Sequence, residues 1–353
     1  MAFQSAAGYS NLPNGVFSPV LYSKKVQKQF RRTAVAEAIT NSDYFGEIKN
    51  FGDSVKIIKE PEITIQAYAR GTQLTPQDLV DSDFYLIVDR ANSFIFRIDD
   101  IEKQQSHVNW MDLASDRAAY DMAMVYDRDI LGYLSGYQYD ETTGIWSARS
   151  TAVGTKSEAS ADADELLAIH KLARANFVTG GSASDALSVG TTGTFDITPL
   201  AMLNRMNRLL DVQNVPKDGR YVVVDPIFVE KLMDENSKLI NNDYNANQNA
   251  GGQLTNGKLI AQKIRGFEVY ESNNLPSLGT GAGTVTTGSG NSTNFGVILA
   301  GQMTAAATAQ QLEKTEHYRD PYSFGDIVRG MSLYGRKILK PQALVRAIWA
   351  SNS

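Results

Sequence analysis

The chain has 353 residues, of which 42% are hydrophobic and 21% charged, so it has the composition of an ordinary globular protein and room for two core-bearing domains. The formal net charge of -5 argues against a dedicated nucleic-acid-binding protein, because such proteins usually carry a clear basic excess. The absence of cysteine excludes disulfides, thiolate metal sites and cysteine nucleophiles, and no apolar run approaches the roughly 18 residues that a membrane-spanning helix needs.

The chain begins with a segment that carries no signal of regular structure. Residues 1–20 are rich in Ser, Asn, Gly and Pro, which predicts an extended arm. A helix is predicted over residues 24–41, with an apolar face that repeats every four residues. That face consists of Val26, Phe30, Ala34 and Ala38. The start of this helix carries five basic residues and no acid: Lys24, Lys25, Lys28, Arg31 and Arg32.

Strand signals follow in the next part of the chain. Alternating and β-branched segments predict strands over 54–58, 62–68, 84–88 and 94–98. In the second of these, Ile63 and Ile65 alternate with polar residues, and this pattern predicts a half-buried ribbon. The dipeptides Arg70-Gly71 and Thr75-Pro76 mark the turn region between the two halves of the ribbon.

Residues 100–131 contain neither Gly nor Pro and predict one long helix that ends at Gly132 and Gly136. At about 1.5 Å per residue, this helix reaches about 50 Å. Its apolar stripe is narrow and consists of Ile101, Val108, Met111, Ala118, Met122 and Val125. A ribbon and a mostly polar rod of this length cannot bury their surfaces within one small domain. We therefore expect other copies of the same chain to cover them.

The second half of the chain alternates helices and strands. Residues 162–177 are predicted as a helix, between a small polar loop and a Gly/Ser/Thr tract. Thr198-Pro199 and Asp225-Pro226 are helix starts, because each places an N-cap residue before a proline at the first helical position. Strands are predicted over 221–224, 266–270 and 295–300. These elements predict an α/β domain over residues 199–310.

The tail, residues 327–350, again carries strand signals. Between Val328 and Trp349 it contains basic residues and no acid. These are Arg329, Arg336, Lys337, Lys340 and Arg346.

Patterns that could carry chemistry are weak. Gly252–Lys258 has the spacing of a phosphate-binding loop, but Leu259 stands where a Ser or Thr would hold magnesium. Asp99, Asp100 and Glu102 stand at a helix N-terminus, where the helix dipole favours carboxylates. Asp127 and Asp129 point to different helix faces and are expected to be solvated or paired. We predict no catalytic residue, no cofactor site and no metal site.

The distribution of charge is more informative. Residues 99–129 contain eight acids and three bases, whereas residues 24–32 contain five bases and no acid. The two segments could be separate solvated faces, because single surface ion pairs are weak. Alternatively, the basic segment docks on the acidic helix of a neighbouring copy, or it faces a polyanion such as packaged DNA.

The order of these features resembles the major capsid proteins of tailed bacteriophages with the Hong Kong 97-type fold. The features are the basic arm, an excursion beginning Gly52-Asp53-Ser54, the long helix opening at Ile98-Asp99-Asp100, an α/β region containing Gly266–Pro276, and a closing strand at Tyr334–Ile338. The resemblance covers nearly the whole chain, and it is the order of the motifs that is specific.

The resemblance implies an α+β fold with five parts. These are an N-terminal arm at 1–50, an E-loop β hairpin at 51–99, a peripheral domain at 100–198 with its spine helix at 100–137, an axial domain at 199–310, and a return to the peripheral domain at 311–353. Copies of the chain would form the hexamers and pentamers of an icosahedral head around double-stranded DNA. The chain would be located in the virion capsid after assembly in the host cytoplasm.

The resemblance also implies partners. About fifty residues precede the E-loop, too few for a fused scaffolding domain, so a separate scaffolding protein is expected, together with a portal and a possible decoration protein. No membrane partner is expected. In the family's name-giving member an E-loop Lys bonds to an Asn of a neighbour, whereas residues 66–82 contain no Lys, so no covalent cross-link is expected.

Ten residues are candidates for contact with a neighbouring subunit or with DNA: Lys24, Lys25, Lys28, Arg31, Arg32, Tyr68, Arg70, Arg336, Lys337 and Lys340. Two other classes of protein remain open. One is a non-viral encapsulating shell with the same fold, and the other is a soluble α/β enzyme with a concave polar pocket.

Overall fold

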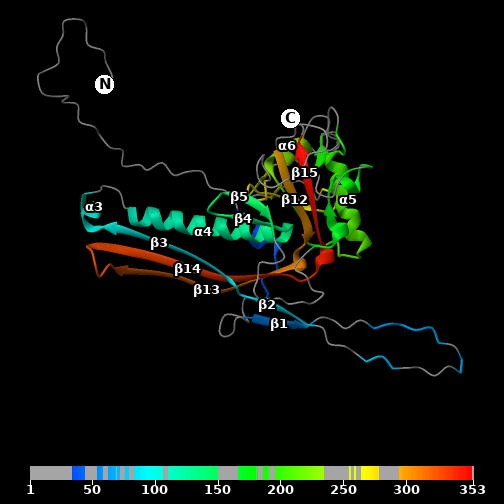
Figure 1. Ribbon diagram of the computed structural model, residues 1–353, viewed down its shortest axis with the longest axis horizontal. Helices are drawn as coiled ribbons and strands as arrows, with labels where there is room; N and C mark the ends of the chain where they lie inside the picture. Colours follow the sequence, from blue (N-terminus) through cyan, green and yellow to red (C-terminus); the bar gives the residue numbers. More distant parts are fainter. Residues whose placement is uncertain are drawn as a thin grey trace, which may run out of the picture.

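The computed structural model shows an elongated molecule (Figure 1). A long helix lies over a three-stranded sheet that reaches one end, and a larger mixed sheet with its own helices lies toward the other end. The described residues are 34–43, 54–58, 63–68, 70–71, 76–78, 83–105, 110–149, 166–179, 181, 186–190, 195–233, 254–255, 258–259, 264–277 and 294–351. The basic segment 24–32 and most of Gly252–Lys258 lie outside these residues.

The larger sheet contains eight of the described strands. They are β6 Lys171–Leu172, β7 Leu187–Val189, β8 Arg220–Val224, β9 Leu254–Thr255, β10 Lys258–Leu259, β11 Glu268–Glu271, β12 Asn294–Gln302 and β15 Leu344–Ser351. Strands β8 and β11 are parallel, and β12 runs antiparallel between β8 and β15. Strand β15 is also parallel to β6 and β7. The last strand of the chain thus lies inside this sheet, between β12 on one side and the short edge strands β6 and β7 on the other, whereas its sequence position assigns it to the tail.

Strand β8 is the centre of the core because both of its faces are covered. Val222 and Val224 pack with the helices on one face, and Tyr221 and Val223 pack with the end of the long helix on the other. Every residue of β8 is buried. A strand covered on both sides reads as a continuous apolar run in the sequence, and the predicted strand at 221–224 is confirmed.

Helices α5 Pro199–Val212 and α6 Pro226–Leu232 begin where the sequence predicts. The hydroxyl of Thr198 accepts a hydrogen bond from the Ala201 N–H, and the carboxylate of Asp225 accepts one from the Phe228 N–H at 3.0 Å. Both caps satisfy N–H groups that have no partner inside the helix. Leu203, Met206 and Leu210 of α5 are fully buried in the core, and Leu200 is partly buried against it.

The three-stranded sheet is long and narrow. It consists of β3 Arg90–Asp99, β14 Gly325–Ile338 in the centre and β13 Ala306–Arg319, all antiparallel. The sequence groups β3 with the E-loop ribbon, whereas the structure pairs it with β14, from more than two hundred residues away. The ribbon itself consists of β1 Ser54–Ile58 paired antiparallel with β2 Asp83–Ile87.

The predicted long helix corresponds to α3 Asp100–Gln105 and α4 Trp110–Ser135, and residues 106–109 are not described. Full burial in α4 begins only at Met124, and Ile101 of the predicted stripe is exposed. Gly136, with φ of 80°, follows the last helical residue, as expected of a left-handed C-terminal position. Gly132 lies inside the helix against Trp146, so its predicted role as a helix terminator is wrong.

The remaining elements are short. Helix α1 spans Ala36–Ile39, β4 Tyr137–Asp140 pairs with β5 Ile145–Ala148, and 3-10 turns span Ala168–His170, Arg174–Asn176, Met303–Ala305 and Pro341–Ala343. In the described part of the predicted helix 24–41, Ala34 and Ala38 are exposed and Val35, Ala36 and Ile39 are buried, so the predicted apolar face is wrong there. The prediction of a helix at 162–177 is also wrong over its described residues, because β6 in this range pairs with β15 in the larger sheet.

Candidate functional site

The C-terminal half of α4 is held by carboxylates on two of its faces. Asp127 is fully buried, and its Oδ1 accepts hydrogen bonds from the N–H groups of Val35 and Ala36, both at 2.7 Å. Its Oδ2 accepts one from Nδ2 of Asn274 at 2.6 Å. Burial raises the pKa of Asp127, although these hydrogen bonds oppose the rise. The prediction that Asp127 is solvated or ion-paired is therefore wrong. Instead, the residue ties the arm and the larger sheet to the helix.

The second carboxylate, Asp129, is paired with a base from the tail. Arg336 forms an ion pair with Asp129 and donates to its backbone carbonyl at 3.0 Å, and the hydroxyl of Tyr334 donates to the same carboxylate. Two guanidinium groups lie over the ring of Tyr133. The Cζ atom of Arg336 is 4.5 Å from the ring centroid, and that of Arg149 is 4.4 Å from it. The prediction that Asp129 is paired is confirmed.

The ten candidate contact residues divide into three groups in the structure. Arg336 is nearly buried and paired within the chain, and Lys337 is also buried. Tyr68, Arg70 and Lys340 are exposed. The five basic arm residues, Lys24, Lys25, Lys28, Arg31 and Arg32, lie outside the described residues. Two of the tail's basic residues hold α4 within the chain, because Arg336 pairs with Asp129 and Arg346 donates to the carbonyl of Ser135.

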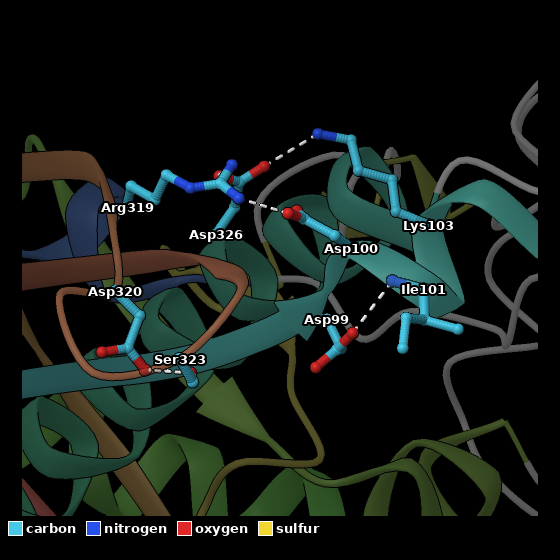
Figure 2. A network of polar contacts seen from close by, with 8 residues as sticks. All are labelled: Asp99, Asp100, Ile101, Lys103, Arg319, Asp320, Ser323 and Asp326. Atoms are coloured by element: carbon cyan, nitrogen blue, oxygen red, sulfur yellow. Dashed lines mark hydrogen bonds and ion pairs between the residues drawn. The ribbon is translucent and has the colours of Figure 1, made fainter.

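The far end of the three-stranded sheet is an organised charged tip (Figure 2). Lys103 of α3 pairs with Asp326 of β14 at 2.8 Å, and Arg319 of β13 pairs with Asp100. The carboxylate of Asp99 accepts from the Ile101 N–H at 2.9 Å, so the predicted capping role of an acid at this helix start is confirmed. The hydrogen bond and charge of Lys103 hold the pKa of Asp326 below its ordinary value.

The turn between β13 and β14, residues 320–324, is here named the tip turn. The carboxylate of Asp320 accepts hydrogen bonds from the hydroxyl of Ser323 and from the Tyr322 N–H, and these bonds lower the pKa of Asp320. The Asp100 N–H donates to the carbonyl of Phe324 at 3.1 Å. This ordered turn leaves Tyr322 96% exposed and Phe324 78% exposed. Neither aromatic residue is among the ten candidates predicted from the sequence, although an aromatic pair between Pro321 and Gly325 in a polar turn was the available signal.

The second exposed surface is residues 63–68, here named the loop segment. It has an extended backbone and belongs to no β-ladder of the described chain, so the predicted half-buried ribbon at 62–68 is wrong over these residues. Ile63 is 71% exposed and Ile65 is 95% exposed. The Thr64 N–H donates to the side chain of Gln77 at 3.0 Å, which links the two sides of the loop.

The described residues contain no cluster of three or more His, Asp or Glu that could bind a metal ion. Within the same residues, no helix has both the length and the apolar character to cross a membrane. His170 is buried, and its Nδ1 lies 2.9 Å from the carbonyl oxygen of Leu344. This contact gives the residue a structural role in the core.

A long helix over a narrow three-stranded sheet and a mixed α/β sheet at one end together form the Hong Kong 97-type fold, and the fold class expected from the sequence is confirmed.

The solved structures that the chain resembles agree with this class over nearly its full length. A chain of Mycobacterium phage Che8 matches with a TM-score of 0.66 and 23% identity, covering 94% of this chain and 97% of that one. The Cyanophage Pam1 capsid matches with a TM-score of 0.65 and 14% identity, and the match covers 99% of each chain. The capsid of Ralstonia phage GP4 matches with a TM-score of 0.62 and 13% identity, and the match covers 97% of this chain and 98% of that one. No protein-family model and no curated protein sequence matches the chain.

Proposed function

We propose that this chain is the structural coat protein of a phage head, a role that requires no catalytic group. The observation that carries the proposal is the match to the capsid chains of Ralstonia phage GP4 and Cyanophage Pam1 over 97% and 99% of this chain. Neighbouring large apolar side chains that are exposed, Ile63 with Ile65 and Tyr322 with Phe324, support it, because contiguous exposed apolar surface marks sites of contact with other proteins.

The proposed assembly consists of hexamers and pentamers that close an icosahedral head around double-stranded DNA. Many repeated weak contacts then give a strong container through multivalency. The proposed partners are a separate scaffolding protein, a portal and possibly a decoration protein, with assembly in the host cytoplasm. DNA contact would be sequence-independent and would use the basic arm residues Lys24 to Arg32.

The parts of the chain are proposed as follows, with two boundaries moved from the sequence prediction. Residues 1–50 form the N-terminal arm, and the E-loop ends at β2, since β3 pairs with β14 of the peripheral domain. The axial domain begins at Pro199 and includes β15, because this strand lies beside β12. Helix α4 is the spine helix.

The test is electron microscopy of the purified chain, expressed alone and together with the genes that flank its own. We expect closed shells of uniform size when a scaffolding gene is present, and irregular assemblies without it. A monodisperse monomer under every condition would overturn the proposal. Regular heads from the chain alone would remove the scaffolding partner but leave the coat-protein role.

A further inference from the structure

We propose that Gly335 is a positioning residue for assembly. Together with Ala307 and Ala309 it forms a patch of small residues, here named the seat, against which β2 and the residue after it pack. The seat fixes the direction in which the β1–β2 ribbon leaves the three-stranded sheet, and this direction sets the curvature of the proposed shell. Only the second part rests on the proposed coat-protein function, because the direction of the ribbon is a property of the single chain.

The chain passes from the edge of the three-stranded sheet onto its face at the seat. Strand β3 lies beside β14, and the ladder between them ends at the pair Arg90 and Tyr334. Just before β3, the backbone of Ile87 and Val88 lies against the Cα of Gly335. One backbone can cross another this closely only where the crossed strand carries no side chain. The glycine is therefore a requirement of the crossing.

A side chain at position 335 would meet backbone atoms that cannot turn aside. A Cβ on Gly335 would lie 2.9 Å from the carbonyl carbon of Ile87 and 3.0 Å from the Cα of Val88, and closer still to the Ile87 carbonyl oxygen. Because carbon atoms make favourable contact at roughly 3.5 Å, an alanine here has to lift the crossing segment by roughly 1 Å. Gly330 on the same strand differs, since the atoms nearest to its Cβ would belong to the ring of Phe94, which can rotate.

The rest of the seat holds the ribbon close to the sheet. Leu86 is fully buried and Val88 is nearly so, and both belong to one apolar cluster with Ala307 and Ala309 of β13. The alanine side chains are short, so β2 lies close to the strands beneath it. Close-packed contacts of this kind transmit a displacement, because they contain no free volume that could absorb it. A lift at Gly335 is therefore passed on to the ribbon.

The direction of the ribbon matters because the ribbon leads to the loop segment. The loop segment and the tip turn lie at opposite ends of the long axis of the molecule (Figure 1). Each strand residue adds about 3.3 Å, so a small rotation at the seat moves the loop segment much further than the crossing itself. In an assembly of identical copies, the relative placement of the surfaces on one copy sets the rotation from that copy to the next. The ribbon direction therefore enters the curvature.

The first experiment measures the ribbon direction in the unassembled chain. The natural chain contains no cysteine, so Ile58→Cys on β1 and Ala119→Cys on α4, both at exposed positions, provide two unique sites for spin labels. The distance between the labels is measured by pulsed electron paramagnetic resonance. In Gly335→Ala we expect the mean distance to shift by about 2 Å or more, because the lift at the crossing is multiplied along β2. Gly330→Ala, the same substitution on the same strand, should leave the distance unchanged.

A second variant keeps the inference testable if Gly335→Ala does not fold. Leu86→Ala removes packing from the seat without inserting an atom, so the distribution of label distances should broaden around the natural mean. A natural mean and width in the folded variants would overturn the inference. An equal shift in Gly330→Ala would also overturn it, because the displacement would then not be specific to the crossing.

Particle size tests the link to curvature. Electron microscopy should show that Gly335→Ala forms particles of altered diameter or open sheets, whereas Gly330→Ala keeps the natural diameter. Particles of natural diameter from Gly335→Ala, together with a shifted label distance, would overturn the link and leave the seat standing. If the natural chain forms no particles, the coat-protein role fails, and the label distances still decide whether the seat directs the ribbon.

Discussion

Removing the carboxylate of Asp127 tests whether one buried group joins the arm and the larger sheet to α4. The variant Asp127→Ala leaves three buried N–H donors without an acceptor: those of Val35, Ala36 and Asn274. Each buried donor left unsatisfied costs about 1–3 kcal/mol. Part of this loss is offset, because alanine also removes the desolvation that raises the pKa of Asp127. We expect a net loss of about 3 kcal/mol in the free energy of unfolding.

The variant Asp127→Asn gives a sharper comparison. Its side-chain oxygen can still accept from Val35 and Ala36, but its amide nitrogen would face the Nδ2 donor of Asn274. We expect a loss of about 1 kcal/mol, which is the usual net value of a hydrogen bond. Adding Asn274→Asp supplies an acceptor to that nitrogen and should recover most of the loss, so the double-mutant cycle isolates this pair.

The assay is urea unfolding of the unassembled chain, with hydrogen exchange at the amides of Val35 and Ala36. Protection at these two amides should fall in Asp127→Ala and persist in Asp127→Asn, since only the first variant removes their acceptor. A change in unfolding free energy below about 0.5 kcal/mol for Asp127→Ala, with unchanged protection, would refute the junction.

Three further outcomes are expected. Burial raises the pKa of Asp225 from 3.8 to about 6, so the unfolded chain releases this proton first, and stability falls as the pH rises between these values and then stays level. Asp225→Asn keeps an acceptor for the Phe228 N–H and should gain up to about 3 kcal/mol at pH 8, measured by urea unfolding; no gain there would contradict the buried charge. Gly132→Ala should lose about 1–3 kcal/mol, although alanine favours helices, because its Cβ would lie 2.7 Å from Trp146 and 2.9 Å from the carbonyl of Tyr137. Assembled particles should give a single band at the mass of one chain on a reducing denaturing gel, and a ladder would show that the absence of Lys from residues 66–82 does not prevent cross-linking.

Elements defined by local signals were predictable from the sequence. The caps of α5 and α6 and the apolar run of β8 are each specified within a few residues, and the structure places all three as expected. The long helix was predictable for the same reason, since the absence of Gly and Pro is a local property.

Pairing over long distances in sequence was not predictable. Strand β6 lies in a segment with helical composition, but its ladder partner is β15, more than 170 residues away. The role of Asp127 depends on amides about 90 residues before it and on an amide nitrogen 147 residues after it. A single acid on a helix face carries no local sign of such partners, so the expectation of a solvated or ion-paired residue follows the usual behaviour of Asp.

The loop segment illustrates a different limit, and one that is informative. A period-two pattern predicts that one face of a strand is buried, but it does not indicate which chain covers that face. In the single chain Ile63 and Ile65 are exposed, although their pattern predicts burial. The apolar residues at the end of α4 are buried by the same chain, unlike Ile63 and Ile65. They include Met124, Ile130 and Leu134. Where a segment carries a burial pattern that its own chain leaves exposed, the pattern is consistent with burial in the proposed assembly. Tyr322 and Phe324 of the tip turn are exposed in the same way, and the proposed assembly would bring further copies of the chain to both surfaces.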